Sequence, residues 1–314
     1  MPAFTATAPA KIILFGEHAV VYGQPAIAVP VSKVQTRVMV SATPLAKPGE
    51  VRLQSPLVGL DTTLPQLDPA HPLAKTIAAL LEHLKIARLP ACSIRISSNI
   101  PVAAGMGSGA AVTVAMLRAL SAFLGHPLAD ETVSALAFEV EKVHHGTPSG
   151  IDNTVITYRR GVYFVKGQPI QFLTTPRAFT ILIADTGTPS PTSITVGEVR
   201  KAWQTEPARY ENIFERIGQI VHQARKSIEN GAIKPLGRLM DENHSQLQEL
   251  GVSSPKLDQL VEVARRNGAL GAKLSGGGRG GNLIALVESD QEELAASALR
   301  EAGAVNVIAT QVGI

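Results

Sequence analysis

Hydrophobic and polar positions alternate along the first part of the chain in a way that predicts strands. Residues 4–40 read as strands broken by turns, among them the apolar stretches AKIILF and VQTRVMVSA. Residues 44–72 are rich in proline and leucine and predict loops and short strands rather than a linker. Apolar residues at helical spacing then predict a helix over about 72–87, and a further strand is expected over 91–98.

A glycine-rich stretch, AAGMGSGAA at 103–111, follows that strand and leads into a helix predicted over about 109–124. Asp130 is expected to cap the next helix, because aspartate is favoured at helix N-termini. That helix is predicted to run to His144 and to stop at Gly146.

The second half of the chain has a different pattern. The strands GVYFVK and FTILIAD are predicted near 161–166 and 179–185, and most of 206–303 reads as amphipathic helices. The stretch GAKLSGGGRGGNLIALVE interrupts those helices, and VNVIATQV predicts a final strand. Strands first and helices later indicate an α+β fold rather than strict alternation of strand and helix.

Length and composition indicate a globular protein with a full core. The chain has 314 residues, of which 45% are hydrophobic and 18% charged. The change in pattern places a soft boundary near 175–190. We therefore expect an N-terminal domain over 1–178 and a C-terminal domain over 179–314.

The cysteine content and the lack of long apolar runs bear on location. Cys92 is the single cysteine, so it cannot form an internal disulfide, and its apolar surroundings favour a buried structural thiol over a nucleophile. The sequence shows neither a signal-peptide pattern nor an apolar run near the ~20 residues of a membrane span. We expect a cytoplasmic protein without a membrane partner.

Charge narrows the class of ligand only slightly. The formal net charge is +3 and the sequence pI is about 9.0, with lysines and arginines scattered along the chain. A nucleic-acid-binding protein would show a denser basic stripe, so no nucleic acid is expected. Small anionic ligands are compatible with this charge.

The glycine-rich stretch is a candidate phosphate site. Backbone N–H groups at a helix N-terminus bind phosphate oxygens, and glycines let the chain approach them closely. A Walker loop is absent, whereas the dinucleotide pattern G-x-G-x-x-[GA] is matched by Gly105, Gly107 and Ala110. From this stretch alone, nucleotide binding and a plain structural turn both stay open.

Three further stretches carry candidate chemistry. In PAKIILFGEHAVVYG, Lys11 starts an apolar strand that ends at the turn GEH, although a solvated lysine is the ordinary alternative. In EVEKVHHGTPSGIDN, Glu141 lies on a helix and the following turn presents Asp152; a capped helix and an ordinary turn are the alternative. KLSGGGRGGN is a second glycine-rich loop, which a phosphoryl-transfer enzyme could use to surround its substrates.

Taken in order, these four stretches resemble the motifs of the GHMP kinases, and in detail those of the mevalonate kinase branch. GTPSPTSITVGEVRKAW is also similar to a segment of that branch. The resemblance implies an α+β two-lobed GHMP kinase fold, with an N-terminal lobe like domain 2 of ribosomal protein S5 and a ferredoxin-like C-terminal lobe. The glycine-rich stretch would then hold ATP, and its dinucleotide pattern would be accidental.

The resemblance also implies residue roles. Asp152 would be the catalytic carboxylate with Lys11 as its partner, and Glu141 would hold Mg²⁺. Glu17 and His18 would face the acceptor. The backbone expected to surround the triphosphate comprises Pro101, Val102, Ala103, Ala104, Gly105, Met106, Gly107, Ser108, Gly109 and Ala110.

Two positions depart from the pattern of the family. Mevalonate kinases usually have two consecutive serines where this chain has Ser108 and Gly109, so that Ser108 or water would have to complete the Mg²⁺ site. Arg279 stands in what is normally a run of glycines, where its side chain could meet phosphate or point to solvent.

The activity that the resemblance implies is ATP-dependent phosphorylation of (R)-mevalonate at its 5-hydroxyl, with Mg²⁺ as cofactor. The alternatives are phosphomevalonate kinase, another small-molecule kinase of the family, or a nucleotide-binding relative that has lost catalysis. For the acceptor carboxylate, the candidate partners are His18, Arg159, Arg160 and the GTPSPTS turn. The resemblance is compatible with a homodimer.

Overall fold

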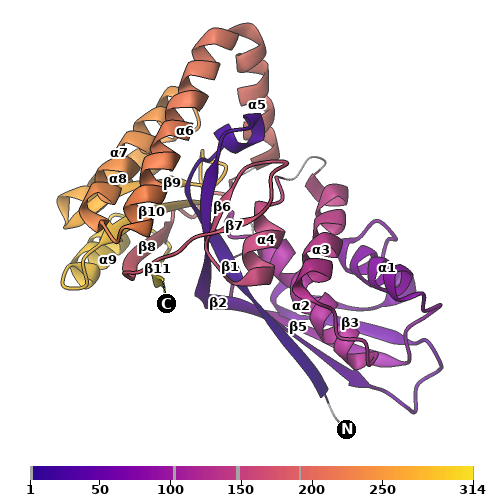
Figure 1. Cartoon of the computed structure of the whole chain (residues 1–314). Helices are drawn as coiled ribbons and strands as arrows, with labels where there is room; N and C mark the ends of the chain where they lie inside the picture. Colours follow the sequence, from indigo (N-terminus) through magenta and orange to yellow (C-terminus); the bar gives the residue numbers. More distant parts are fainter. Residues whose placement is uncertain (1–2, 102–103, 146–148, 191, 314) are drawn as a thin grey trace. The chain divides into compact units, whose positions relative to one another are not determined.

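The computed structural model describes residues 3–101, 104–145, 149–190 and 192–313, apart from the side chains of 143–145 (Figure 1). Its contacts divide the chain into two compact units. We call them the first unit (Met1–Ala10, Val34–Ile100 and Gly107–Arg159) and the second unit (Lys11–Lys33, Pro101–Met106 and Arg160–Ile314). The expected domain division between 178 and 179 stays a prediction.

The larger sheet has the strand order β4-β3-β5-β2-β6-β7, with β1 paired to β2. Strands β3 and β5 are parallel, whereas β2 pairs antiparallel with β5 and β6. Alternate side chains of β2, including Val38 and Val40, are buried, as expected for a strand with one face on a core. The strands are β1 (Ala3–Phe15), β2 (Ala26–Ala42), β3 (Val51–Ser55), β4 (Leu60–Thr63), β5 (Cys92–Ser98), β6 (Val162–Phe164) and β7 (Gln171–Phe172).

Helices α1 (Pro72–Leu84), α2 (Ser108–Phe123), α3 (Asp130–His145) and α4 (Ile151–Tyr158) pack against one another in the first unit (Figure 1). The first two confirm the helices predicted over 72–87 and 109–124. Cys92 of β5 is buried and free, and burial raises the pKa of its thiol to about 11, as expected of a structural thiol.

Two details of this helical layer differ from the sequence-based expectation. Asp130 is the first residue of α3 and not its cap, and its carboxylate accepts a hydrogen bond of 2.6 Å from Arg118 Nη2. Asp152 lies in the first turn of helix α4, which begins after Gly150 at φ 89°, where a turn alone was expected. Short 3-10 helices complete the connections: η1 (Ala19–Tyr22), η2 (Pro56–Val58) and η3 (Leu64–Gln66).

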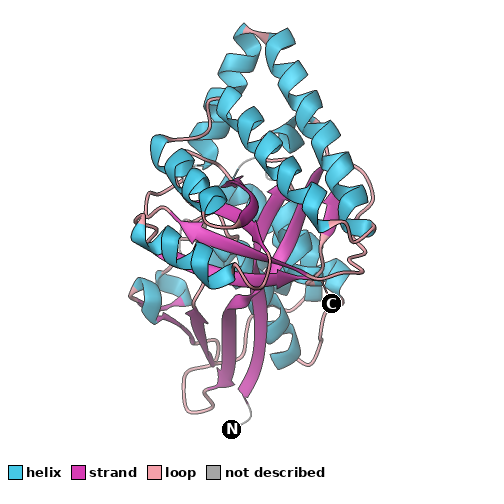
Figure 2. Cartoon of the chain, turned by 90° about the vertical axis from the view of Figure 1, so that its left-hand side faces the viewer, coloured by secondary structure: helices cyan, strands magenta, loops and turns pink. Residues whose placement is uncertain are grey.

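The second sheet is antiparallel, with the order β11-β8-β10-β9. Its strands are β8 (Phe179–Asp185), β9 (Ala269–Ser275), β10 (Asn282–Val287) and β11 (Asn306–Val312). Helices α7 (Ile233–Glu249), α8 (Pro255–Arg266) and α9 (Glu292–Glu301) pack against these strands (Figure 2). Helix α6 (Pro207–Glu229) packs on α7, and α5 (Thr192–Thr205) packs on α6. The strands on either side of KLSGGGRGGN and the final strand are confirmed.

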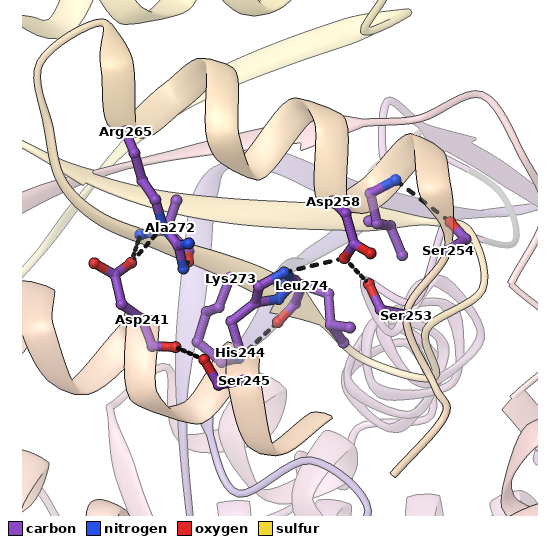
Figure 3. A network of polar contacts seen from close by, with 11 residues as sticks. Asp241, His244, Ser245, Ser253, Ser254, Asp258, Arg265, Ala272, Lys273 and Leu274 are labelled. Atoms are coloured by element: carbon purple, nitrogen blue, oxygen red, sulfur yellow. Dashed lines mark hydrogen bonds and ion pairs between the residues drawn. The ribbon is translucent and has the colours of Figure 1, made fainter. Parts of the chain in front are cut away.

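Helix α7 covers the free edge of strand β9. Its Asp241 accepts from the backbone N–H of Ala272 at 2.9 Å, and its His244 Nδ1 accepts from that of Leu274 at 3.3 Å (Figure 3). The two elements approach so closely that a Cβ on Gly271 would lie 1.9 Å from the carbonyl oxygen of Gly237. Side chains of α7 therefore satisfy backbone groups that an edge strand would otherwise leave unpaired.

The two sheets and their helices confirm the α+β class. Across the part of the chain that the structure describes, none of the helices is long and apolar enough to span a membrane.

Candidate active site

The first motif forms the end of strand β1 and the turn after it. Lys11 lies inside β1 with 5% of its surface exposed, so it is not the solvated lysine at a strand end that was the ordinary alternative. The turn needs Gly16, at φ 96°, because a Cβ there would lie 2.5 Å from the carbonyl oxygen of Pro25. Tyr22 then stacks on Phe214 with ring centroids 4.0 Å apart, which fixes the chain beyond the turn.

The third motif meets this turn through three polar contacts. Ser275 Oγ donates to the carbonyl oxygen of Ile13 at 2.7 Å. The ammonium group of Lys273 forms an ion pair with the carboxylate of Glu17, and both side chains are fully buried. His18 Nε2 lies 3.0 Å from the carbonyl oxygen of Gly277. The turn that carries Glu17 and His18 is thereby held to strand β9 and the loop after it.

The beginning of the glycine-rich stretch joins the same group. Asn282 Nδ2 donates to the carbonyl oxygen of Ala104 at 2.5 Å. The backbone N–H of Lys11 donates to the carbonyl oxygen of Met106 at 3.1 Å. Pro101 belongs to this unit, whereas Val102 and Ala103 lie outside the described residues. Three stretches that are far apart in the sequence therefore come together in the second unit.

Helix α2 begins where this stretch ends, in the first unit. Gly107 precedes it at φ 71°; within the described residues no side chain caps this end, and the first turn is free of acidic groups. A Cβ placed on Gly109 would have none of the described atoms within 4 Å. This combination of N–H groups and open space suits a phosphate group.

Burial governs the electrostatics of the turn. It raises the pKa of Glu17 and lowers that of Lys273, while the contact between the two opposes both shifts. Burial also lowers the pKa of His18 to about 4, so its ring is neutral at pH 7. The contact with a carbonyl oxygen requires the proton on Nε2, which leaves Nδ1 as an acceptor.

Two acceptor atoms of the turn have no partner among the residues that the structure describes. Glu17 Oε2 and His18 Nδ1 are buried and make no hydrogen bond with any described residue. Buried polar atoms normally have one, so each of these two atoms could accept one further hydrogen bond. A neutral His18 does not supply the positive charge that was considered for an acceptor carboxylate.

The remaining predicted residues belong to the first unit. Ser108 begins α2 and is half-buried, Glu141 lies on α3 with 9% of its surface exposed, and Asp152 is a half-buried residue in the first turn of α4. The three helices pack against one another. The predicted residues thus form two groups, one on packed helices of the first unit and one in the second unit with Lys11, Glu17 and His18.

The donor set of the first unit fits a magnesium ion that is bound mainly by nucleotide and water. Glu141 and Ser108 offer a carboxylate and a hydroxyl oxygen, the ligand types that Mg²⁺ prefers. Among the described residues there is no cluster of three or more His, Cys, Asp or Glu side chains that could hold a metal alone. Such a set agrees with Mg²⁺, which keeps several waters and binds substrate phosphates.

Three arginines considered for anion binding have protein partners. Arg279 adopts φ 58°, and its guanidinium forms an ion pair with Glu198 of α5. Its side chain therefore does not point freely to solvent. Arg159 donates to the backbone and side chain of Thr7. Arg160 lies over the ring of Phe172, 4.2 Å from its centroid.

Sequence reasoning missed the residues that join the motifs, namely Lys273, Ser275 and Asn282. They flank the second glycine-rich loop. Polar residues on either side of such a loop are a signal that could have singled them out. The sequence does not reveal their partners, which lie as many as 262 residues away.

Comparison with known proteins identifies the family. The model of the GHMP kinases N-terminal domain matches residues 72–161, and that of the GHMP kinases C-terminal domain matches 224–305. A mevalonate kinase of Pyrococcus horikoshii is 36% identical over 323 residues, covering 96% of this chain and 94% of the relative. The chain belongs to the GHMP kinase family.

Solved structures agree with this assignment. The mevalonate kinase of L. major, solved in complex with R-mevalonate, is 31% identical to this GHMP kinase, with a TM-score of 0.84, and the match covers 100% of this chain and 96% of that one. The mevalonate kinase of Methanococcus jannaschii is 27% identical with a TM-score of 0.87, covering 100% and 99%. As a kinase of this family, the protein uses ATP as co-substrate.

Proposed function

We propose that this GHMP kinase transfers the γ-phosphoryl group of ATP to the 5-hydroxyl of (R)-mevalonate, giving 5-phosphomevalonate and ADP for isoprenoid precursor synthesis. The observation that carries the proposal is the likeness, over 100% of the chain, to a mevalonate kinase solved with R-mevalonate. Fold alone would not support a particular acceptor, because one fold serves many substrates. The motifs around GEH and GTPSGID give the local support.

In the proposed reaction, positioning and charge neutralisation do most of the work, because phosphoryl transfer passes through a loose transition state. The N–H groups at the start of α2 bind the phosphates of ATP. Asp152 orients the acceptor hydroxyl and takes its proton late in the transfer. Lys11 balances negative charge on the γ-phosphoryl group.

Glu17 and His18 are proposed to face the acceptor. Their buried atoms Oε2 and Nδ1 are both hydrogen-bond acceptors without a partner among the described residues. A hydroxyl group of the alcohol supplies the donor that they lack. The carboxylate of mevalonate offers only acceptor oxygens, so this turn suits a hydroxyl and not the carboxylate.

Glu141 and Ser108 are proposed to hold Mg²⁺ together with ATP and water. The ion supplies positive charge to the phosphoryl oxygens when it is bound. A cytoplasmic location and a homodimer also remain proposals, which rest on the single cysteine and on the resemblance to the family.

The proposal is tested by an acceptor panel. The purified protein is assayed with ATP and with mevalonate, phosphomevalonate, homoserine or galactose at equal concentrations. Mevalonate should give the highest kcat/KM. A higher kcat/KM for phosphomevalonate would overturn the assignment of mevalonate as the acceptor. Arg159 and Arg160, the candidate partners for a second phosphate, already contact Thr7 and Phe172, which argues against that outcome. ATP binding without turnover of any alcohol would indicate a relative that has lost catalysis.

A further inference from the structure

Strand β9 presents one fully buried cation, Lys273. The backbone N–H groups on either side of it, those of Ala272 and Leu274, are held by Asp241 and His244 of helix α7 (Figure 3). Burial of an ammonium group is costly, so its position needs strong compensation. Two acceptors provide it, namely the carboxylate of Glu17 and the carbonyl oxygen of Leu274, which lies 2.6 Å away.

Glu17 is the ion-pair partner of Lys273. It is fully buried as well, one of its oxygens pairs with Lys273, and the other is an acceptor without a partner among the described residues. Breaking this buried pair would leave an uncompensated charge, so the pair holds the Glu17 carboxylate beside Lys273. The position of the unpaired oxygen is therefore set by where β9 places the Lys273 ammonium.

Packed apolar residues can replace a buried ion pair with no loss of stability, so such a pair is weak evidence for a purely stabilising role. The location favours another role, since Lys273 stands at the start of the third motif and Glu17 in the turn of the first. His18, the neighbour of Glu17, is tied to the same loop through Gly277. The pair is thus part of the contact between two motifs.

We propose that Lys273 is a positioning residue for the acceptor: it holds Glu17, and with it the GEH turn, in the orientation that receives the acceptor hydroxyl. Asp241 and His244 of helix α7 accept hydrogen bonds from the backbone of β9 on either side of Lys273. The inference rests on the proposed function only in taking Glu17 as a residue that faces the acceptor. Lys273 itself is not expected to touch either substrate.

The test is a double-mutant cycle of Lys273→Met and Glu17→Gln, read separately for acceptor and nucleotide. Lys273→Met should raise the acceptor KM and lower kcat, together by about 100-fold in kcat/KM, the size of effect that a small misplacement has. The affinity for a non-hydrolysable ATP analogue should stay close to that of the wild type. Because both residues act through one carboxylate, adding Lys273→Met to Glu17→Gln should cause little further loss.

The double variant also keeps the test valid if Lys273→Met alone does not fold, because it removes both charges. Lys256→Met is the matched control, since Lys256 of α8 donates to the carbonyl oxygen of Ala302 at 2.6 Å and lies outside the motifs. It should leave the acceptor KM unchanged.

An unchanged acceptor KM in Lys273→Met, with only the active fraction reduced, would show a merely structural pair and overturn the inference. Fully multiplicative effects of the two substitutions would overturn it too. The cycle is measured with the best acceptor of the panel. The role of Lys273 is therefore tested even if mevalonate is not that acceptor.

Discussion

At the scale of single residues, His244 shows how burial fixes a protonation state. Its side chain is 2% exposed, its Nδ1 accepts from Leu274, and its Nε2 lies 3.2 Å from Asp258 Oδ1. Nδ1 can accept only when it carries no proton, so the neutral ring has its proton on Nε2, facing Asp258. Burial, with the nearby charge of Arg265, lowers the pKa of His244 to about 4.

This lowered pKa predicts a loss of folding stability in acid. As the pH falls from about 6.5, the unfolded chain binds a proton at this position before the folded chain does, so the free energy of unfolding decreases until about pH 4. A shift of that size corresponds to about 3 kcal/mol. Denaturant unfolding from pH 7 to pH 4 should therefore show a smaller loss in His244→Asn than in the wild type, and parallel curves would contradict the assignment.

Asp152 carries the proposed proton chemistry. Asp152→Asn should lower kcat by about 10²–10⁴-fold, the usual contribution of a positioned base, while an ATP analogue binds nearly as before. Single-turnover kinetics with mevalonate measure the effect. Asp130→Asn is the matched control, because Asp130 lies in the first turn of the neighbouring helix α3. Near-normal turnover in Asp152→Asn would remove Asp152 from the catalytic role.

At the scale of elements, the start of helix α2 holds Gly109 where the resemblance to the family leads us to expect a second serine. Gly109 lies in the first turn of α2, and a side chain there meets none of the described atoms within 4 Å. Gly109→Ser should fold well and lower the Mg²⁺ concentration that gives half-maximal rate, because it restores a hydroxyl group.

Gly109→Ala is the control for that prediction. It favours the helical conformation without adding an oxygen. Equal Mg²⁺ dependence in the Gly109→Ser and Gly109→Ala variants would show that the second serine position is not a ligand here.

The close packing of α7 on β9 gives a second prediction at this scale. A methyl group on Gly271 would collide with the backbone of Gly237, so Gly271→Ala should destabilise the fold by about 1–3 kcal/mol. Gly197→Ala in α5 is the control, because its Cβ meets none of the described atoms within 4 Å, and it should be neutral or slightly stabilising. Thermal unfolding of both variants measures the difference, and equal melting temperatures would argue against this packing.

Elements with a strong pattern could be predicted from the sequence, whereas weakly patterned ones could not. Helix α2 is rich in alanine, which favours helix, and its predicted span nearly matches the observed one. Helix α4 has the sequence IDNTVITY, in which β-branched residues disfavour helix. Its start depends on Gly150 in a left-handed conformation, which sequence spacing does not reveal.

The candidate site follows the same division. The glycine-rich loops and the GEH turn could be identified because clustered glycines and charged residues can be read directly from the sequence. The pairing of Lys273 with Glu17 joins residues 256 positions apart, and no periodicity records such a contact. Motifs therefore predicted where the chemistry lies, while the residues that hold the motifs together required the fold.

At the scale of the whole molecule, the chain matches mevalonate kinases over nearly its full length, and both family domains are present. The motifs of the second unit converge through backbone and buried polar contacts. A reaction that depends on positioning needs its groups held by such contacts. These contacts favour an active kinase over a nucleotide-binding relative that has lost catalysis.

The most direct test of this central claim is analysis of the reaction products. The protein is incubated with ATP, Mg²⁺ and (R)-mevalonate, ADP is quantified, and the new phosphate ester is located by proton-coupled phosphorus NMR. We predict equal amounts of ADP and of one monoester whose phosphorus couples to the C5 methylene protons. ADP formed with inorganic phosphate in place of the ester, or an ester at another position, would contradict the proposed function.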